Sequence, residues 1–225
     1  MVRLTTGGDN KMANPKIVEA VKKAIEEGKE RERKFKESVD LAINLKEVDL
    51  SIPKNRIQEE IPLPHGRGKD VKVAVFASGE LALKAKDVAD RVISPEEISE
   101  LAEDKRAARK VANEYEFFLA DASLMATIGK TLGIALGPRG KMPAPVPPRA
   151  NIEEIIKRYR SAVRLRVRDQ PQVACRIGTE DQSEEELAEN AQAIINQILQ
   201  KYKPYNLDKV YVKLTMGKPV SVKVK

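Results

Sequence analysis

The chain has 225 residues, a formal net charge of +7 and 41% hydrophobic residues, with one histidine and one cysteine. This length suffices for one large domain or two modest ones, each burying its own core. A lone cysteine excludes an internal disulfide, and with a single histidine it makes a zinc site of the usual ligand types implausible. No stretch approaches the roughly 20 apolar residues of a membrane span, and the polar start Met1–Thr6 does not resemble a secretory signal. We expect a cytoplasmic protein that needs no metal, cofactor or membrane.

The positive charge is unevenly distributed along the chain. Residues 67–155 contain 14 Lys and Arg against 14 Asp and Glu, a balance of zero. The remainder therefore holds 41 − 14 = 27 cations and 34 − 14 = 20 anions, which accounts for the whole +7. Excess cationic charge favours nucleic-acid binding, so the two terminal segments are the expected nucleic-acid binders and the middle is not.

The first segment predicts a helix followed by a strand. Asn14 is a typical N-cap before Pro15, apolar residues then recur at helical spacing, and Gly28 is expected to end the helix. A mixed charge run at 29–36 contains Phe35, which fits either a solvated turn or a surface for bases and phosphates. Alternating apolar residues at 39–45 then predict a strand with one buried face.

A change of composition follows at the proline-rich stretch before residue 70. Residues 52–63 are polar and interrupted by prolines, which predicts an edge strand or loop. The run Pro64-His65-Gly66-Arg67-Gly68-Lys69 is rich in glycine, as a crossing between domains often is. We expect His65, Gly66 and Gly68 to form a hinge. His65 has no candidate nucleophile or acid nearby in sequence, so a catalytic role is not expected.

The middle segment alternates buried strands with helices. Ser94–Glu97 has the pattern of a capping box, and it opens a helix expected to reach about Tyr115. Such alternation predicts a small, mainly parallel, doubly wound sheet. The expected strands cover 71–77, 88–93 and 117–120, and the expected helices cover 80–86, 94–115 and 124–136.

Nucleotide binding by this middle sheet is not supported by the motifs. No Gly-x-Gly-x-x-Gly follows a strand, and the triplet Gly129–Thr131 lacks the upstream glycine of a phosphate-binding loop, where Leu124 stands. The distinctive piece is the rigid loop 136–143, which presents Arg139 and Lys141 between glycines and prolines. It is either an ordinary connection or a secondary RNA contact through exposed cations.

The last segment returns to an antiparallel pattern. Asn151 caps a helix, and Arg164, Arg166 and Arg168 then share one face of a strand. Such arginines repel one another unless a polyanion lies across them, so we expect this strand beside the RNA surface, although a simple exposed strand remains possible. Further predicted elements are a strand at 172–177 in which Cys175 packs, a helix opened by the capping box Ser183–Glu186, and a hairpin at 209–225.

The hairpin tip Thr215-Met216-Gly217-Lys218 carries a hydroxyl, a thioether, bare backbone and an ammonium. Small groups allow close approach to a large ligand, and the flanking lysines indicate that this ligand is anionic. A surface hairpin with a solvated face is the alternative.

The expected fold class is α/β in two domains. Residues 1–66 and 156–225 form a discontinuous α+β terminal domain, with two helices on one face of an antiparallel, split β-α-β sheet. Residues 67–155 form an inserted Rossmann-like, three-layer α/β domain.

Four motifs in order resemble the "L-one" family of large-subunit ribosomal proteins. They are Lys34-Phe35…Ser38-Val39, Leu63-Pro64-His65-Gly66-x-Gly68-Lys69, Leu132-Gly133-x-x-Leu136-Gly137-Pro138-Arg139-Gly140-x-Met142-Pro143, and Val210-Tyr211-Val212…Thr215-Met216-Gly217. The resemblance covers essentially the whole chain and is strongest to the archaeal branch.

The resemblance implies a non-enzymatic protein that is a monomer when free. It implies binding of large-subunit ribosomal RNA to form a mobile stalk, release of exit-site tRNA, and repression of the protein's own messenger RNA. The implied RNA contacts fall on Thr215, Met216 and Gly217 of the tip, on Lys34, Phe35 and Ser38, and on Arg166. Lys218-Pro219 departs from a bacterial pattern with proline directly after glycine, and Ser38 stands where threonine is common.

Two other functions remain to be weighed. A nucleotide- or phosphate-handling enzyme would use the middle domain, but that domain lacks a fingerprint, an activated nucleophile and a carboxylate pair. A DNA-binding role would need a recognition helix for the major groove, which a flat antiparallel surface does not provide.

Overall fold

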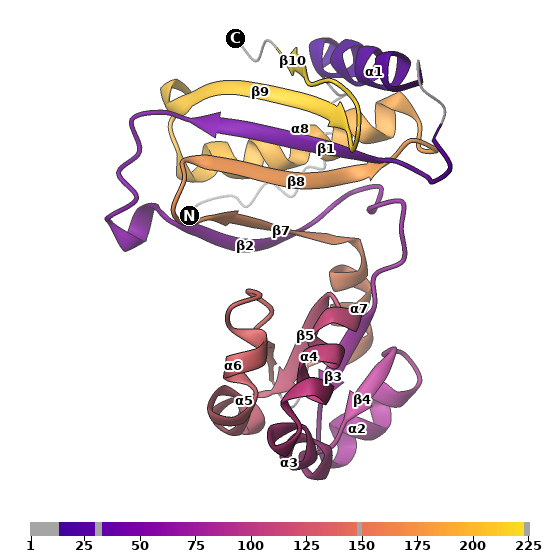
Figure 1. Ribbon diagram of the computed structural model, residues 1–225, viewed down its shortest axis with the longest axis vertical. Helices are drawn as coiled ribbons and strands as arrows, with labels where there is room; N and C mark the ends of the chain where they lie inside the picture. The colour runs from indigo at the N-terminus through magenta and orange to yellow at the C-terminus, as the bar shows by residue number, and fades with distance from the viewer. Residues whose placement is uncertain (1–13, 30–32, 148–149, 223–225) are drawn as a thin grey trace, which may run out of the picture. The chain divides into compact units, whose positions relative to one another are not determined.

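The chain folds into two compact units, which Figure 1 shows in the computed structural model. The structure describes residues 14–29, 33–147 and 150–222. The terminal unit consists of Met1–Gly68 and Val163–Lys225, and the inserted unit of Lys69–Ala162. None of the helices in the described ranges is long and apolar enough to cross a membrane.

The terminal unit is built on a four-stranded antiparallel sheet of order β10-β9-β1-β8. Its strands are β1 (Ser38–Leu45), β8 (Gln172–Thr179), β9 (Leu207–Leu214) and β10 (Val220–Val222). Leu41 in the centre of β1 pairs with Cys175 on one side and Val212 on the other. Strict alternation of buried and partly exposed residues along β1 confirms the predicted strand, and the pairing of β10 with β9 confirms the predicted hairpin as far as Val222. Residues 223–225 of that prediction lie outside the described residues.

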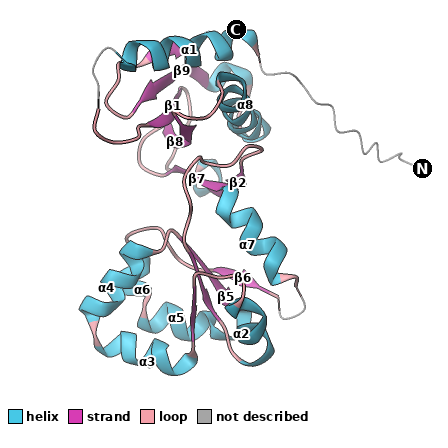
Figure 2. Ribbon diagram, turned by 90° about the vertical axis from the view of Figure 1, so that its right-hand side faces the viewer, coloured by secondary structure: helices cyan, strands magenta, loops and turns pink. Residues whose placement is uncertain are grey.

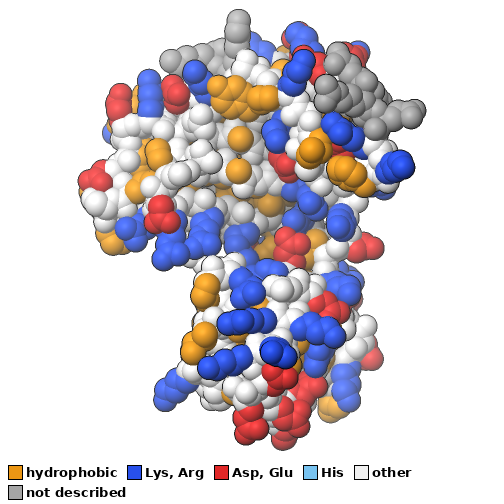
Figure 3. Space-filling view, viewed as in Figure 1, with side chains coloured by type: hydrophobic (Ala, Val, Ile, Leu, Met, Phe, Trp, Pro, Cys, Tyr) orange, Lys and Arg blue, Asp and Glu red, His pale blue; other side chains and the backbone are white. Residues whose placement is uncertain are grey.

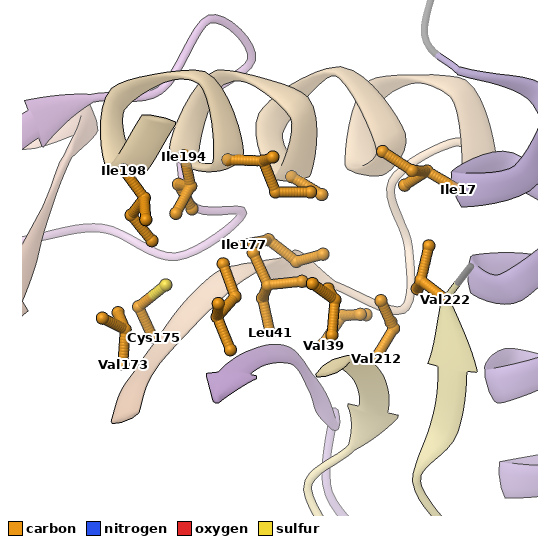
Figure 4. Close-up of a cluster of buried hydrophobic side chains, with 14 of the residues drawn as sticks. Ile17, Val39, Leu41, Val173, Cys175, Ile177, Ile194, Ile198, Val212 and Val222 are labelled. Atoms are coloured by element: carbon orange, nitrogen blue, oxygen red, sulfur yellow. The ribbon is translucent and has the colours of Figure 1, made fainter. Parts of the chain in front are cut away.

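Helices α1 (Pro15–Lys29) and α8 (Glu184–Lys201) cover the apolar face of this sheet (Figure 2). Side chains from both helices meet those of the strands in one core, which Figure 4 shows in close-up. Ser183 and Glu186 form the predicted capping box of α8. Gly28 does not end α1, because the helix runs on to Lys29. A Cβ atom at Gly28 would lie 2.1 Å from Leu214 Cδ1, so the glycine allows α1 to pack closely on β9.

A second, two-stranded sheet pairs β2 (Ile57–Pro62) with β7 (Ala162–Val167). It follows a 3-10 turn at Pro53–Asn55 and confirms the edge strand expected at 52–63. Ile57, Ile61 and Leu165 from this pair join the core of the terminal unit. A further 3-10 turn, Pro204–Asn206, precedes β9.

The inserted unit confirms the predicted parallel sheet, in the order β4-β3-β5-β6. Alternate residues of its buried strands enter two cores. Val73 and Phe117 face the core shared with α2 and α7, whereas Phe76 and Phe118 face the core shared with α3 to α6. The unit is therefore a three-layer sandwich. Its elements are β3 (Val73–Phe76), α2 (Gly79–Lys86), β4 (Arg91–Ile93), α3 (Pro95–Glu103), α4 (Lys105–Glu114), β5 (Phe117–Asp121), α5 (Met125–Thr131), α6 (Gly133–Leu136), β6 (Ala144–Val146) and α7 (Ile152–Ser161).

Two predicted helices of this unit are each divided. The helix expected over 94–115 breaks at Asp104, whose ψ of 94° ends α3 and whose Oδ1 accepts hydrogen bonds from the N–H groups of Arg106 and Ala107 to begin α4. The helix expected over 124–136 becomes a 3-10 turn (Ala122–Leu124), α5 and α6. Strand β6 was not predicted, because Pro145 is unusual in a strand and is tolerated at the sheet edge.

The triplet Gly129–Thr131 lies within α5. Its backbone N–H groups belong to a helix rather than to a phosphate-binding loop, in line with the rejection of a nucleotide site. Helix α7 belongs wholly to the inserted unit, because Ile152 and Ile156 are buried in its core.

Candidate nucleic-acid interface

The turn between β9 and β10 presents an exposed apolar side chain. The Gly217 N–H donates a hydrogen bond to the Leu214 carbonyl at 3.0 Å, which closes the turn. The Met216 side chain is 59% exposed, and Thr215 and Lys218 are exposed on either side. A Cβ atom at Gly217 would lie 3.1 Å from Leu214 Cβ, so glycine suits the turn's own packing as well as leaving its backbone bare. We call residues 215–218 the tip.

Thr215 fastens the tip to the start of β1. Its N–H donates to the Ser38 carbonyl at 3.0 Å, and its hydroxyl donates to the same oxygen at 3.2 Å. The hydroxyl also accepts from the Ser38 N–H at 3.3 Å. One lone pair of the Thr215 oxygen remains for a ligand, because a hydroxyl has one donor and two acceptor positions. The first role of this side chain is therefore to hold the tip in place.

A buried carboxylate lies beneath the tip. Glu37 is 2% exposed, and its Oε2 accepts from the Met216 N–H at 3.3 Å. Its Oε1 lies 3.3 Å from Nε of Arg33, an ion pair without hydrogen-bond geometry, and the Arg33 side chain is 30% exposed. Glu180 accepts from the Glu37 N–H at 2.9 Å. Sequence reasoning missed Glu37 and Arg33, because a glutamate within a charge run gives no sign of burial.

The predicted residues before β1 gather at the same end of the sheet. Phe35 is 53% exposed and stands two residues before Glu37, within roughly 7 Å along the chain. Lys34 is exposed beside it, and Lys36 forms an ion pair with Asp181. The structure thus places an aromatic ring, a thioether and several cations around one tip.

The sheet face opposite the two helices adds charge next to the tip. Asp40 on β1 pairs across the strands with Arg176 on β8 and Lys213 on β9. Burial raises the pKa of the Asp40 carboxyl, and the two cations oppose that shift. Ala42 is the next residue of β1 on this face, with Ala174 and Tyr211 as its partners. This face therefore combines small side chains with polar ones, and it carries cations on both sides of one carboxylate.

The arginine strand does not neighbour the hairpin, contrary to the prediction. β7 lies in the separate sheet with β2, and Arg164 forms an ion pair with Glu60 at 3.0 Å. The repulsion expected among the three arginines is thus relieved within the protein at Arg164. Arg166 is half-buried on the same strand.

Arg168 lies just beyond β7, and a short turn leads from it to Gln172. Gln172 pairs with Asn44 of β1, whereas the tip is bonded to Ser38. These positions on β1 are about 20 Å apart at the usual rise per residue. The turn that carries Arg168 is therefore at the other end of β1 from the tip.

Two of the four sequence motifs lie at or beside the tip, and comparison with known proteins decides which family the chain belongs to. Residues 21–218 match the model described as the ribosomal protein L1p/L10e family. The chain belongs to this family. Since it is a family of ribosomal proteins, the expectation of a non-enzymatic protein holds.

Relatives with 48–51% identity are archaeal. The large ribosomal subunit protein uL1 of Thermofilum pendens is 48% identical over 92% of this chain and 92% of its own length. Those of Methanothrix thermoacetophila and Methanocella arvoryzae are each 51% identical, over 92% and 94% of this chain and 98% and 100% of their own lengths. The expected resemblance to the archaeal branch is confirmed.

The Gly-Pro-Arg-Gly loop of this family member is turned partly inward. Lys141 Nζ donates to the carbonyls of Ala112 and Tyr115 at 2.9 and 2.8 Å, at the C-terminal end of α4. An ammonium is favourable there, because the last carbonyls of a helix are unsatisfied and partly negative. Lys141 is half-buried, so the expectation of an exposed cation is wrong for this residue. Arg139 is exposed and donates from Nε to Asn113 Oδ1 at 2.9 Å.

The predicted hinge residues are held by the terminal unit. Asn190, which is fully buried on α8, accepts from the His65 N–H at 3.1 Å and donates to the carbonyls of Gly66 and Ile177 at 3.0 and 2.8 Å. His65 Nε2 lies 2.5 Å from Glu189 Oε2. Gly68 has a φ of +66°, which favours glycine, and a Cβ atom there would approach Thr179.

Proposed function

We propose that this protein is a component of the large ribosomal subunit and binds large-subunit ribosomal RNA through the tip. Membership of the L1 family and the relatives named as large ribosomal subunit proteins support the assignment. The main observation in favour of this site is the structure of the tip. Met216 is exposed on a turn that is held by hydrogen bonds to Ser38 and Glu37, two neighbouring residues that are distant from the turn in sequence.

The arrangement suits recognition of RNA by shape. A turn already held in its final conformation loses little freedom on binding, so more of the interaction energy contributes to affinity. Met216 and Phe35 provide apolar surface for a sugar or base, and the bare backbone at Gly217 allows a ribose to come close. Lys34, Lys218 and Arg33 supply the salt-dependent attraction to phosphates.

The wider roles follow from the family resemblance. We propose that the protein forms the mobile stalk of the subunit, assists release of exit-site tRNA, and represses its own messenger RNA through the same tip. Movement of the inserted unit would begin after Gly68, because His65 and Gly66 are bonded to α8. A single-molecule distance between the units that stays constant with and without RNA would contradict the proposed movement.

Met216→Asp tests the site. The side chain is exposed, so the fold should persist, and the added negative charge should weaken binding to large-subunit RNA by about 2–4 kcal/mol, as at interface hot spots. Binding is measured by filter retention at fixed salt. Leu83→Asp, at an exposed leucine on α2 of the inserted unit, is the matched control and should change affinity little. Lys218→Ala should cost less than Met216→Asp. Equal affinities for all three variants and the unmodified protein would refute the placement of the site.

A further inference from the structure

The inserted unit, residues 69–162, contains 16 Lys and Arg against 14 Asp and Glu, a small excess, yet its charges are segregated in space. The exposed face of α3 is acidic, and it carries Glu96, Glu100 and Glu103. In Figure 3, red side chains gather at the lower end of this unit over α3, and blue ones spread across its face over α4. A small net charge therefore conceals a cationic face on one helix, formed by Lys105, Arg106, Arg109 and Lys110, which we call the α4 cationic face.

The positions of these four cations lower the stability of α4. Lys105 and Arg109, and likewise Arg106 and Lys110, are like charges four residues apart, which is a destabilising spacing. Lys105 and Arg106 also occupy the first turn, where the helix dipole favours anions, so the N-cap Asp104 is the only acidic residue that serves this end of the helix in the described ranges. Within the described ranges none of the four forms an ion pair.

We propose that the α4 cationic face is a second RNA-binding surface, which contacts the phosphate backbone of an RNA segment other than the one read by the tip. This inference rests on the proposed ribosomal function and assigns a role to the inserted unit. Phosphates would relieve the repulsion among the cations and the mismatch with the dipole, so the bound state removes the cost that the free helix carries.

The surface continues beyond α4 in line with its cations. Lys105, Arg109 and Asn113 follow one another at intervals of four residues, so they lie along one side of the helix. Asn113 holds Arg139 through the 2.9 Å hydrogen bond from Nε, and the Ala135 carbonyl accepts from Nη1 of the same guanidinium at 3.0 Å. The arginine of the family's Gly-Pro-Arg-Gly loop is thus fixed at the end of the row, and the row gains a third cation.

An apolar notch adjoins the row. It has a volume of about 80 Å³, and its lining includes Lys105, Arg109 and Ile134, the last with 75% of its surface exposed. Guanidinium groups match the geometry of phosphate oxygens, and an apolar recess beside them can receive the face of a base or a ribose. Fixed cations beside a small recess favour RNA over an acidic protein, which would need a longer apolar groove.

The test is RNA binding by the full-length double variant Lys105→Ala/Arg109→Ala. The matched control is Lys84→Ala/Lys86→Ala, which removes two exposed cations from α2 of the same unit. The probes are bulk transfer RNA as a folded RNA and polyglutamate as a protein-like polyanion, each titrated between about 50 and 200 mM salt. Dissociation constants and melting temperatures are measured for every variant.

We expect the α4 variant to bind transfer RNA about five- to tenfold more weakly than the unmodified protein, with a salt slope smaller by about 2. Its melting temperature should stay the same or rise by about 1–3 °C, because like-charge repulsion is removed and alanine favours helix. A purely structural role would lower the melting temperature instead. The control should change RNA affinity less than twofold.

Three outcomes would overturn the inference: unchanged affinity for transfer RNA, an equal loss in the α2 control, or an equal loss of polyglutamate binding, which would indicate an acidic protein partner. The Met216→Asp experiment is read separately, on large-subunit RNA. Failure of that experiment would refute the tip as the RNA site and leave the result for α4 standing, and the reverse also holds.

Discussion

The tip and the α4 cationic face are two surfaces of different construction. The tip joins chain segments that are far apart in sequence, since Ser38 and Glu37 bond to Thr215 and Met216 across nearly 180 residues. The α4 cationic face is a single stretch of helix with charges on its outer side. A surface built by tertiary contacts can present a fixed shape, whereas a charged helix side presents mainly a potential. We therefore expect the tip to select among RNAs and the helix to add attraction.

The largest effect on the stability of the fold should come from disturbing the support of the tip. Gly28→Ala places a Cβ atom 2.1 Å from Leu214 Cδ1, and Leu214 is 1% exposed and leads directly into the tip. We expect overpacking to lower the free energy of unfolding by about 1–3 kcal/mol and to weaken RNA binding as well.

Gly129→Ala is the matched control for this change. Gly129 also lies in a helix, but nothing lies within 4 Å of the added Cβ atom, so alanine should stabilise by up to about 1 kcal/mol. Urea denaturation of both variants gives the comparison. A Gly28→Ala protein as stable as Gly129→Ala would show that the close approach of α1 to β9 can relax.

Glu37→Gln should have the next largest effect. The amide keeps the size of the carboxylate and can still accept from the Met216 N–H, but it no longer attracts Arg33. We expect affinity for large-subunit RNA to fall by about 1–2 kcal/mol, the cost of losing a charged partner in a buried pair.

A double-mutant cycle with Arg33→Gln shows whether the two residues act together. The loss in the double variant should be smaller than the sum of the two single losses. Strict additivity would mean that Glu37 supports the tip without orienting Arg33.

A smaller effect separates the two surfaces by salt. Met216→Ala should change the affinity for large-subunit RNA at every salt concentration by a similar factor, because it removes a local apolar contact and leaves the charge unchanged. Lys105→Ala/Arg109→Ala should matter most at low salt, where attraction to phosphates is strongest. Titrations of both variants from about 50 to 300 mM salt test this difference, and parallel salt curves for the two would remove the distinction between shape and charge.

The last prediction concerns the thiol of Cys175, which lies in the core of the terminal unit and should have the smallest effect on RNA binding. Burial raises the pKa of its thiol to about 12. Because the folded pKa is raised above its ordinary value near 9, the protonated thiol supports the fold below about pH 9, and this support is lost as the pH rises towards 12. A thiol reagent at pH 8 should react with Cys175 slowly until urea unfolds the protein, and fast labelling of the folded chain would contradict the burial.

Periodicity in the sequence predicted most of the strands and helices, because buried faces repeat every two residues in strands and every three to four in helices. The capping box at Ser183 and the hairpin at 209–225 followed from local chemistry. The break at Asp104 was not predictable in this way, since the apolar pattern runs through it and only the bonds of the Asp104 side chain to the next turn divide the helix.

The residues of the candidate site that belong to sequence motifs were predictable. Those whose positions depend on tertiary contacts were not. Thr215, Met216 and Gly217 were found from the hairpin and the family motif. The sequence did not predict that Glu37 is buried beneath the tip or that Lys141 points inward. Both positions depend on hydrogen-bond partners that are distant in sequence. The location of Arg164 to Arg168 also depended on sheet order, which alternation within one strand does not determine.

The side chain of Asn190 determines where the chain can be shortened. Its amide is satisfied by His65, Gly66 and Ile177, all within the terminal unit. A minimal RNA-binding protein made by deleting residues 69–162 keeps every one of these bonds. A deletion that begins four residues earlier, at 65, removes two of its three partners and leaves a fully buried amide with unmet hydrogen bonds. The boundary of a stable terminal fragment thus depends on Asn190 of α8 and on Gln182 before that helix, whose amide donates to the His65 carbonyl.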